Sequence, residues 1–119
     1  MSDKYIVQIN KLIIFNTEII FDFPIKEVIQ IEDMLIVYLD LDDMVISLEE
    51  NIFGVSLSKK EIQWQVEKRN FPKGGYLKMH CPFTGISYSS NKLYLYNWCS
   101  TYLIVDPTSG KVLEQVENR

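Results

Sequence analysis

The sequence predicts an all-β fold built from antiparallel strands. Stretches rich in β-branched and aromatic residues alternate along the chain with short turn sequences. Sustained helical periodicity is missing, and the best candidate for a helical turn, residues 42–51, also suits a strand with a loop. Two segments, 51–67 and 101–117, resemble each other as two copies of one hairpin would.

Seven strands are expected before residue 67. In order, they are Tyr5–Ile9, Leu12–Phe15, Glu18–Asp22, Glu27–Ile31, Met34–Leu39, Ile52–Leu57 and Glu61–Val66. Short turn sequences separate them, such as Asn16-Thr17 and Glu32-Asp33, and turns of this kind join adjacent antiparallel strands.

Five more strands are expected after the loop at Lys68–Gly75, which separates the two copies. They are Tyr76–Met79, Gly85–Tyr88, Lys92–Tyr96, Tyr102–Val105 and Lys111–Val116. The turn before the last strand begins with Asp106-Pro107. Its Gly110 can adopt the positive φ that a bulged hairpin loop requires.

The two copies align without a gap at an offset of 50 residues. Phe53-Gly54-Val55-Ser56 falls on Leu103-Ile104-Val105-Asp106, and Gln65-Val66-Glu67 falls on an identical triplet at 115–117. A strand pair that recurs at this spacing is typical of a propeller blade, and a closed propeller needs at least four blades of about 40–50 residues. Residues 1–119 are therefore expected to form one antiparallel domain of two blade-like four-stranded units, a half β-propeller, plus N-terminal strands.

The segment from Asn51 to Trp64 resembles the blade motif of quinoprotein-like propellers, in which a strand enters a hairpin and a Trp packs between blades. Residues 101–113 resemble it more closely, because their Asp–Gly–Lys turn is intact. In the first copy Lys60 stands where the turn glycine is expected, and in the second copy Glu114 stands where the Trp is expected. The resemblance implies the fold only, since residues that hold a quinone at the axis of a closed ring have no counterpart.

The charge of the chain is unevenly distributed. The net charge is −4, of which residues 1–60 contribute −6 and residues 61–119 contribute +2. An acidic balance argues against nucleic acid or a membrane surface as the partner, because both favour clustered Lys and Arg. It suits a basic protein as the partner.

A small, acidic, free-standing half-propeller is also similar to immunity proteins of bacterial contact-dependent growth inhibition systems. This similarity rests on shape, size and charge. Such proteins neutralise a toxin domain by covering its active site. The resemblance implies a binding protein without enzymatic activity, whose cognate toxin is basic and of the nuclease type.

The first copy contains an acidic insertion. Aligning Leu35 with Leu93 gives an offset of 58, so eight extra residues lie at about 42–50. An insertion in one repeat usually forms a loop on one face, which is often the binding face. Two interpretations stay open, an ordinary solvated loop or a partner-binding surface made of Asp33, Asp40, Asp42, Asp43, Glu49 and Glu50.

A second candidate surface is aromatic. Tyr94, Tyr96 and Trp98 recur at period two, so they line one face of a strand, opposite Leu93 and Leu95. The pattern favours core packing. The alternative is an outer blade face that a half-ring leaves uncovered, where Tyr and Trp would anchor a protein partner.

No pattern predicts catalysis, a metal or a cofactor. His80 adjoins Cys81, but neighbouring side chains of a strand point to opposite faces, so the two do not form a nucleophile and base. With Cys99 they also lack metal-ligand spacing. No export signal or bilayer-spanning apolar run is visible, so we expect a cytoplasmic protein with free thiols.

Three functional hypotheses follow. The first is an inhibitor that occludes a basic toxin, with acidic residues of the 33–50 region in place of substrate phosphates. The second is an oligomeric module in which two half-propellers complete a ring, so a homodimer is possible. The third is a small-ligand-binding or catalytic β domain, which requires a deep pocket near His80.

Overall fold

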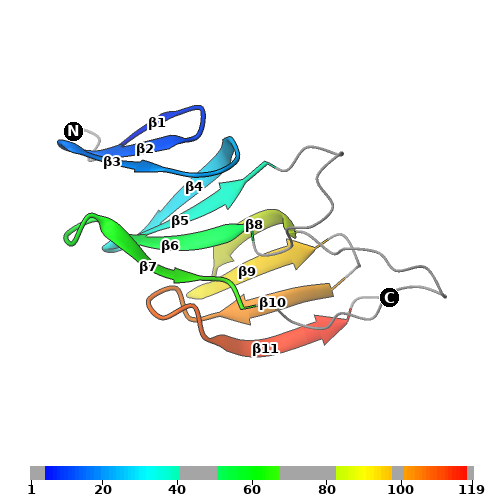
Figure 1. Ribbon diagram of the computed structural model, residues 1–119. Helices are drawn as coiled ribbons and strands as arrows, with labels where there is room; N and C mark the ends of the chain where they lie inside the picture. Colours follow the sequence, from blue (N-terminus) through cyan, green and yellow to red (C-terminus); the bar gives the residue numbers. More distant parts are fainter. Residues whose placement is uncertain (1–4, 41–50, 68–82, 98–100, 118–119) are drawn as a thin grey trace.

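The computed structural model describes residues 5–40, 51–67, 83–97 and 101–117 (Figure 1). These residues form eleven strands and no helix, arranged in three antiparallel sheets. The predicted fold class, two four-stranded units with additional N-terminal strands, is confirmed. Because these ranges contain no helix, they contain none that could span a membrane.

Each sheet is a meander in which strands that follow one another in the sequence pair with one another. The N-terminal sheet contains β1 (Ile6–Gln8), β2 (Lys11–Ile14) and β3 (Thr17–Ile20). The first unit contains β4 (Ile25–Ile31), β5 (Met34–Leu39), β6 (Ile52–Ser56) and β7 (Glu61–Gln65). The second unit contains β8 (Phe83–Ser89), β9 (Lys92–Asn97), β10 (Thr101–Val105) and β11 (Val112–Glu117). The expected strand at Tyr76–Met79 lies outside the described residues, and so does the helical-turn candidate at 42–51 except for Asn51, which directly precedes β6.

The internal repeat extends to the strand registers. Phe53 pairs with Gln65 across β6 and β7, and Leu103 pairs with Gln115 across β10 and β11. The register shifts between residues 54 and 55 in the first hairpin and between residues 104 and 105 in the second. The first two strands of each unit also share a shift, at 25–27 and at 83–85, which is the offset of 58. The sequence alignment therefore describes two copies of one unit.

The hairpin turns of the two copies have the same backbone. The Lys60 N–H donates to the carbonyl of Ser56 at 2.8 Å, and the Gly110 N–H donates to the carbonyl of Asp106 at 2.7 Å. Gly110 has φ +73° and Lys60 has φ +57°, so the lysine adopts the left-handed conformation that glycine adopts in the second copy. That conformation is unfavourable for a residue with a Cβ by about 1–2 kcal/mol.

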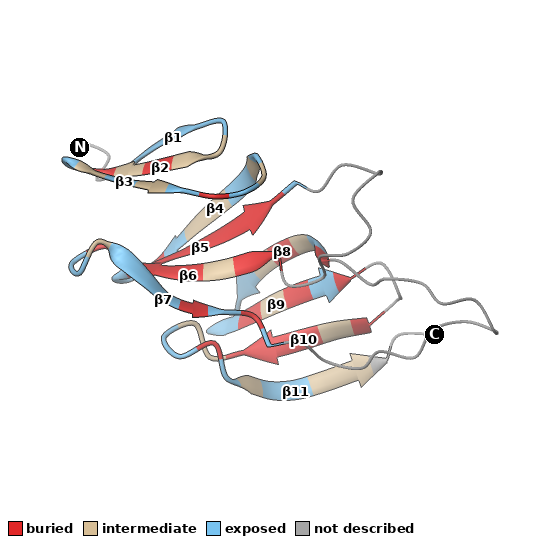
Figure 2. Cartoon of the chain, viewed as in Figure 1, coloured by how far each residue is buried: buried red, intermediate tan, exposed pale blue. Residues whose placement is uncertain are grey.

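The three sheets are stacked, with the first unit as the middle layer and one apolar core between each pair of neighbouring sheets (Figure 1). Because β5 contributes to both cores, all six of its residues are buried (Figure 2). In β9 the pattern alternates, with Leu93 and Leu95 buried and Tyr96 exposed. Among the described residues, β5 is thus covered on both faces and β9 on one.

Trp64 of β7 packs between the two units, as the propeller resemblance implies. Its Nε1 donates to the carbonyl of Pro107 at 2.9 Å, and the side chain is 8% exposed. The indole ring lies against Gly54 of its own unit and Gly110 of the other, where an added Cβ would overlap the ring.

A buried asparagine also joins the two units. Asn51, at the start of β6, donates from Nδ2 to the carbonyls of Leu39 at 3.0 Å and Phe83 at 2.9 Å. Its Oδ1 accepts a hydrogen bond from the N–H of Phe83 at 2.9 Å. One fully buried side chain therefore connects the end of β5 to the beginning of β8.

Candidate functional site

Two of the six residues of the predicted acidic surface, Asp33 and Asp40, lie in the described part of the chain. Asp33 lies in the turn before β5 and Asp40 follows that strand directly, so six strand residues, about 20 Å, separate them. Asp42, Asp43, Glu49 and Glu50 lie outside the described residues. The two described residues of the predicted acidic surface, Asp33 and Asp40, are therefore both exposed but lie at opposite ends of β5.

Asp33, which is exposed, also has a structural role. Its Oδ2 accepts hydrogen bonds from the hydroxyls of Ser56 at 3.0 Å and Ser58 at 2.8 Å, and its Oδ1 accepts one from the N–H of Ser58 at 3.0 Å. The carboxylate thereby fastens the β4–β5 turn to the β6–β7 turn. The sequence placed Asp33 among acidic surface residues because nothing local indicates that the second turn folds onto it.

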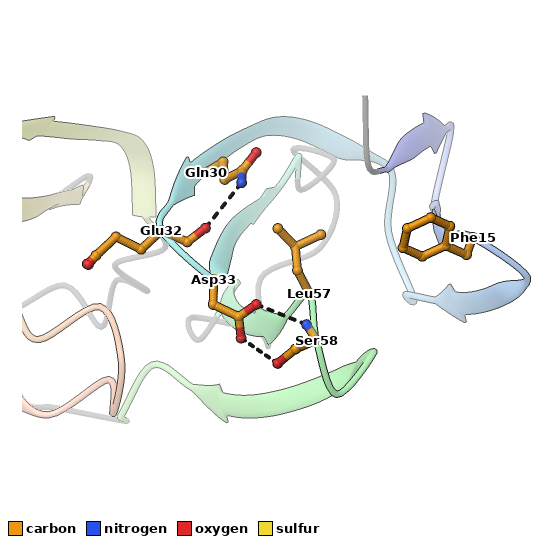
Figure 3. A pocket seen from close by; sticks show the side chains of 6 residues that line it. All are labelled: Phe15, Gln30, Glu32, Asp33, Leu57 and Ser58. Carbon is orange, nitrogen blue, oxygen red and sulfur yellow. Dashed lines mark hydrogen bonds between the residues drawn. The ribbon is translucent and has the colours of Figure 1, made fainter. Parts of the chain in front are cut away.

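An open pocket of about 390 Å³ lies beside this turn pair (Figure 3). Its lining comprises Phe15, Gln30, Glu32, Asp33, Leu57 and Ser58. Its polar groups largely serve the fold, since Asp33 binds Ser58 and Gln30 donates to the carbonyl of Glu32 at 3.1 Å. Phe15 is 66% exposed, and the Nζ of Lys60 lies 5.1 Å from its ring centroid. The lining contains no cysteine or histidine for nucleophilic or acid–base chemistry.

Burial and nearby carboxylates change the pKa of Tyr38, which lies near the C-terminal end of β5. Burial raises the pKa of Tyr38 above its ordinary value of 10.0, and the carboxylates of Asp40 and Glu27 raise it further because they disfavour a phenolate. Tyr38 therefore stays protonated at neutral pH. Its phenol belongs to the core between the two units.

The outward face of the second unit presents a group of three tyrosines. Tyr94 and Tyr96 lie on β9, and Tyr102 lies on β10 directly across from Tyr96. The rings of Tyr94 and Tyr96 are 6.3 Å apart and nearly parallel, at 11°, and the Tyr102 ring is 5.8 Å from each. We call this surface the tyrosine face.

The tyrosine face is open to solvent at its centre. Tyr96 is 40% exposed, and Tyr94 and Tyr102 are half-buried. The neighbouring strand β8 places Gly85 opposite Tyr96 and Ser87 opposite Tyr94, so small side chains lie on that side of the rings, while β10 places the buried Ile104 opposite Tyr94. The hydroxyls of Ser87 and Tyr96 are hydrogen-bonded at 3.1 Å. Core packing, which the sequence pattern favours, is therefore wrong for Tyr96; Trp98 lies outside the described residues.

The same positions are buried in the first unit. At the offsets of 58 and 50, Tyr94, Tyr96 and Tyr102 correspond to Ile36, Tyr38 and Ile52. Those three residues are 0%, 6% and 0% exposed, because the second unit packs on them. The tyrosine face is thus the surface on which a further sheet would pack if the stack continued.

The sequence analysis identified Tyr94 and Tyr96 but missed Tyr102. The offset of 50 contained the signal, since it aligns Tyr102 with Ile52. Within the described ranges, no group of three or more His, Cys, Asp or Glu side chains is placed to hold a metal. His80, Cys81 and Cys99 lie outside these ranges.

The family described as Domain of unknown function (DUF7957) matches residues 3–116, so the chain belongs to this family. No curated protein and no solved structure matches the chain.

Proposed function

We propose that this member of the DUF7957 family is a protein-binding module that acts by surface contact, and that its tyrosine face is the docking surface. The observation that carries the proposal is the exposure of Tyr96 and the partial exposure of Tyr94 and Tyr102, at positions whose equivalents are buried between sheets. A sheet face of this composition gains free energy when another molecule covers it.

The geometry of the rings suits an interface. Ring contacts among the three tyrosines and the hydrogen bond between Ser87 and Tyr96 position the rings before a partner binds. A preorganised surface loses less side-chain entropy on binding than a mobile one does. Tyrosines at the centre of an interface are frequent binding hot spots, each worth about 2 kcal/mol or more on truncation.

Capture experiments test this function. Immobilised wild-type protein is compared with Tyr96→Lys. We expect the substitution to raise the Kd for a captured protein roughly thirtyfold, which corresponds to a loss of about 2 kcal/mol of binding free energy. Tyr88→Lys is the matched control, because Tyr88 is also 40% exposed but pairs with the buried Leu93, on the other face of the same sheet. Equal loss of binding by both variants, or by neither, would argue against the tyrosine face.

A more specific candidate is a cytoplasmic inhibitor that neutralises a basic toxin. The charge of the first 60 residues, −6, and the exposed Asp40 at the insertion support it. In this case, charge reversal at Asp42 and Asp43 should slow association with the toxin domain at low salt, since complementary charges accelerate encounter. The test uses a toxin encoded beside the gene, and association rates that do not change across a salt series would contradict an acidic docking loop.

A further inference from the structure

The N-terminal sheet, at the opposite end of the three-layer stack, exposes a face on which isoleucines alternate with polar residues. Ile6 pairs with Ile13 across β1 and β2, and Ile20 lies on the same face of β3, where it pairs with Lys11. Ile6 is 55% exposed and Ile20 is 65% exposed. The other face of this sheet carries Leu12, which is fully buried against the first unit. We call the outer surface, defined by Ile6, Ile13 and Ile20, the isoleucine face.

The sheets of this molecule pack through unlike faces. The face of the first unit that contains Ile36 and Ile52 packs on the face of the second unit that contains Leu93 and Leu95. The opposite face of the first unit, with Leu35, packs on the inner face of the N-terminal sheet. Within the described residues, no sheet packs on the tyrosine face at one end of the stack or on the isoleucine face at the other.

We propose that the tyrosine face of one copy docks on the isoleucine face of a second copy, head to tail, and that two copies close into a ring. The proposal rests on the proposed function and names the partner as the same chain. It continues, between copies, the packing that already joins the sheets within one copy. Two copies of three sheets give six, within the range of four to eight blades found in closed propellers. A head-to-tail contact forms a ring when its rotation closes.

The chemistry of the two faces is complementary. Isoleucine side chains offer apolar surface to the rings of Tyr94, Tyr96 and Tyr102. Beside the isoleucines lies a partly exposed ion pair, Lys11 Nζ to Glu18 Oε1 at 3.7 Å. A lysine ammonium is attracted to a tyrosine ring face, and a glutamate accepts hydrogen bonds from phenol hydroxyls.

The contact area indicates a weak pair. The isoleucine face has three strands about 4.8 Å apart and about four residues long, so its plan area is roughly 190 Å². A closed dimer contains two such contacts, and each contact buries one face on each copy. The total is roughly 760 Å² if the faces are treated as flat, which lies in the range of weak or transient complexes. A single contact is half that size, so closure of the ring is what makes the pair measurable.

Sedimentation velocity over a protein concentration series tests the pairing with charge-swapped variants. We expect wild-type protein to dimerise with increasing concentration, and Tyr96→Lys and Ile20→Glu each to weaken the dimer at least tenfold. An equimolar mixture of the two variants should dimerise again, because one contact is then unaltered and the other pairs a lysine with a glutamate. Glutamate is compatible with the fold at position 20, whose cross-strand neighbour is Lys11. Circular dichroism verifies that each variant is folded, and Tyr88→Lys should dimerise like the wild type.

Three outcomes overturn the pairing. Wild-type protein that stays monomeric throughout the series excludes it. Dissociation by Tyr96→Lys with no effect of Ile20→Glu indicates that two tyrosine faces meet each other instead. Variants that are monomeric alone and remain monomeric when mixed exclude head-to-tail contact. If a monomeric wild type still captures another protein through Tyr96, the proposed function stands and this inference fails.

Discussion

Substitution of Asn51 tests how firmly the two units are joined. In Asn51→Ala the buried carbonyls of Leu39 and Phe83 lose their donor, and the N–H of Phe83 loses its acceptor. A buried hydrogen bond contributes about 1 kcal/mol net, and a buried group left without a partner costs about 1–3 kcal/mol. Because three such hydrogen bonds are lost, we expect the free energy of unfolding to fall by about 3 kcal/mol. That is a large part of the 5–15 kcal/mol typical of a domain.

The assay is urea denaturation of Asn51→Ala and wild-type protein, followed by circular dichroism. The midpoint should fall while the slope stays unchanged, because the surface exposed on unfolding is nearly the same. Asn16→Ala is the control, since Asn16 lies in an exposed turn and its loss should change stability by no more than about 0.5 kcal/mol.

Asn51→Asp refines the test through its pH dependence. The carboxylate keeps the acceptor for Phe83 but places an oxygen against the two carbonyls that Nδ2 now serves. Burial and these carbonyls favour the protonated acid and raise its folded-state pKa. Stability relative to wild type is therefore highest at low pH and lost as pH rises through that pKa. A loss below about 1 kcal/mol in Asn51→Ala, or no pH dependence in Asn51→Asp, would refute the reasoning.

Other substitutions probe the turns and the buried phenol. Gly110→Ala should lower the melting temperature, because the backbone has positive φ and the new Cβ overlaps the Trp64 ring, whereas Gly85→Ala, with 3.9 Å to its nearest neighbour, should leave it nearly unchanged. Asp33→Ala should lower the free energy of unfolding by about 1–2 kcal/mol in urea titrations, as loss of a helix cap does, and should not alter capture of a partner. Because the pKa of Tyr38 is raised in the folded state, its contribution to stability is complete below pH 10.0 and lost as pH rises through the higher folded-state pKa. Alkaline denaturation should therefore be less steep in Tyr38→Phe, and identical profiles would contradict the shift.

Much of the fold could be predicted because strands and turns are encoded locally. Turn residues and β-rich stretches gave the eleven described strands to within a few residues, and the repeat gave the equivalence of the two hairpins. The turn at Lys60 shows that residue type alone does not predict a left-handed backbone conformation. A lysine adopts there the conformation that Gly110 adopts in the other copy, because the shared hairpin geometry overrides its own preference.

The candidate site could be predicted only in part. The period of two in β9 separated Leu93 and Leu95 from Tyr94 and Tyr96, but both sets are apolar, so the pattern does not say which face is covered. Asp33 was grouped with distant acidic residues because its partner Ser58 lies 25 positions along the chain.

Strand order, the duplicated hairpin and the alternation of side chains follow from the sequence by itself, since each depends on residues that are neighbours in the chain. Which faces stay open, and which polar residues fasten sheet to sheet, only the tertiary structure decided. The physical reason is that burial depends on what packs from outside a strand. The same strand position is buried at Tyr38, where the second unit covers it, and 40% exposed at Tyr96, on the outward face of the last described sheet.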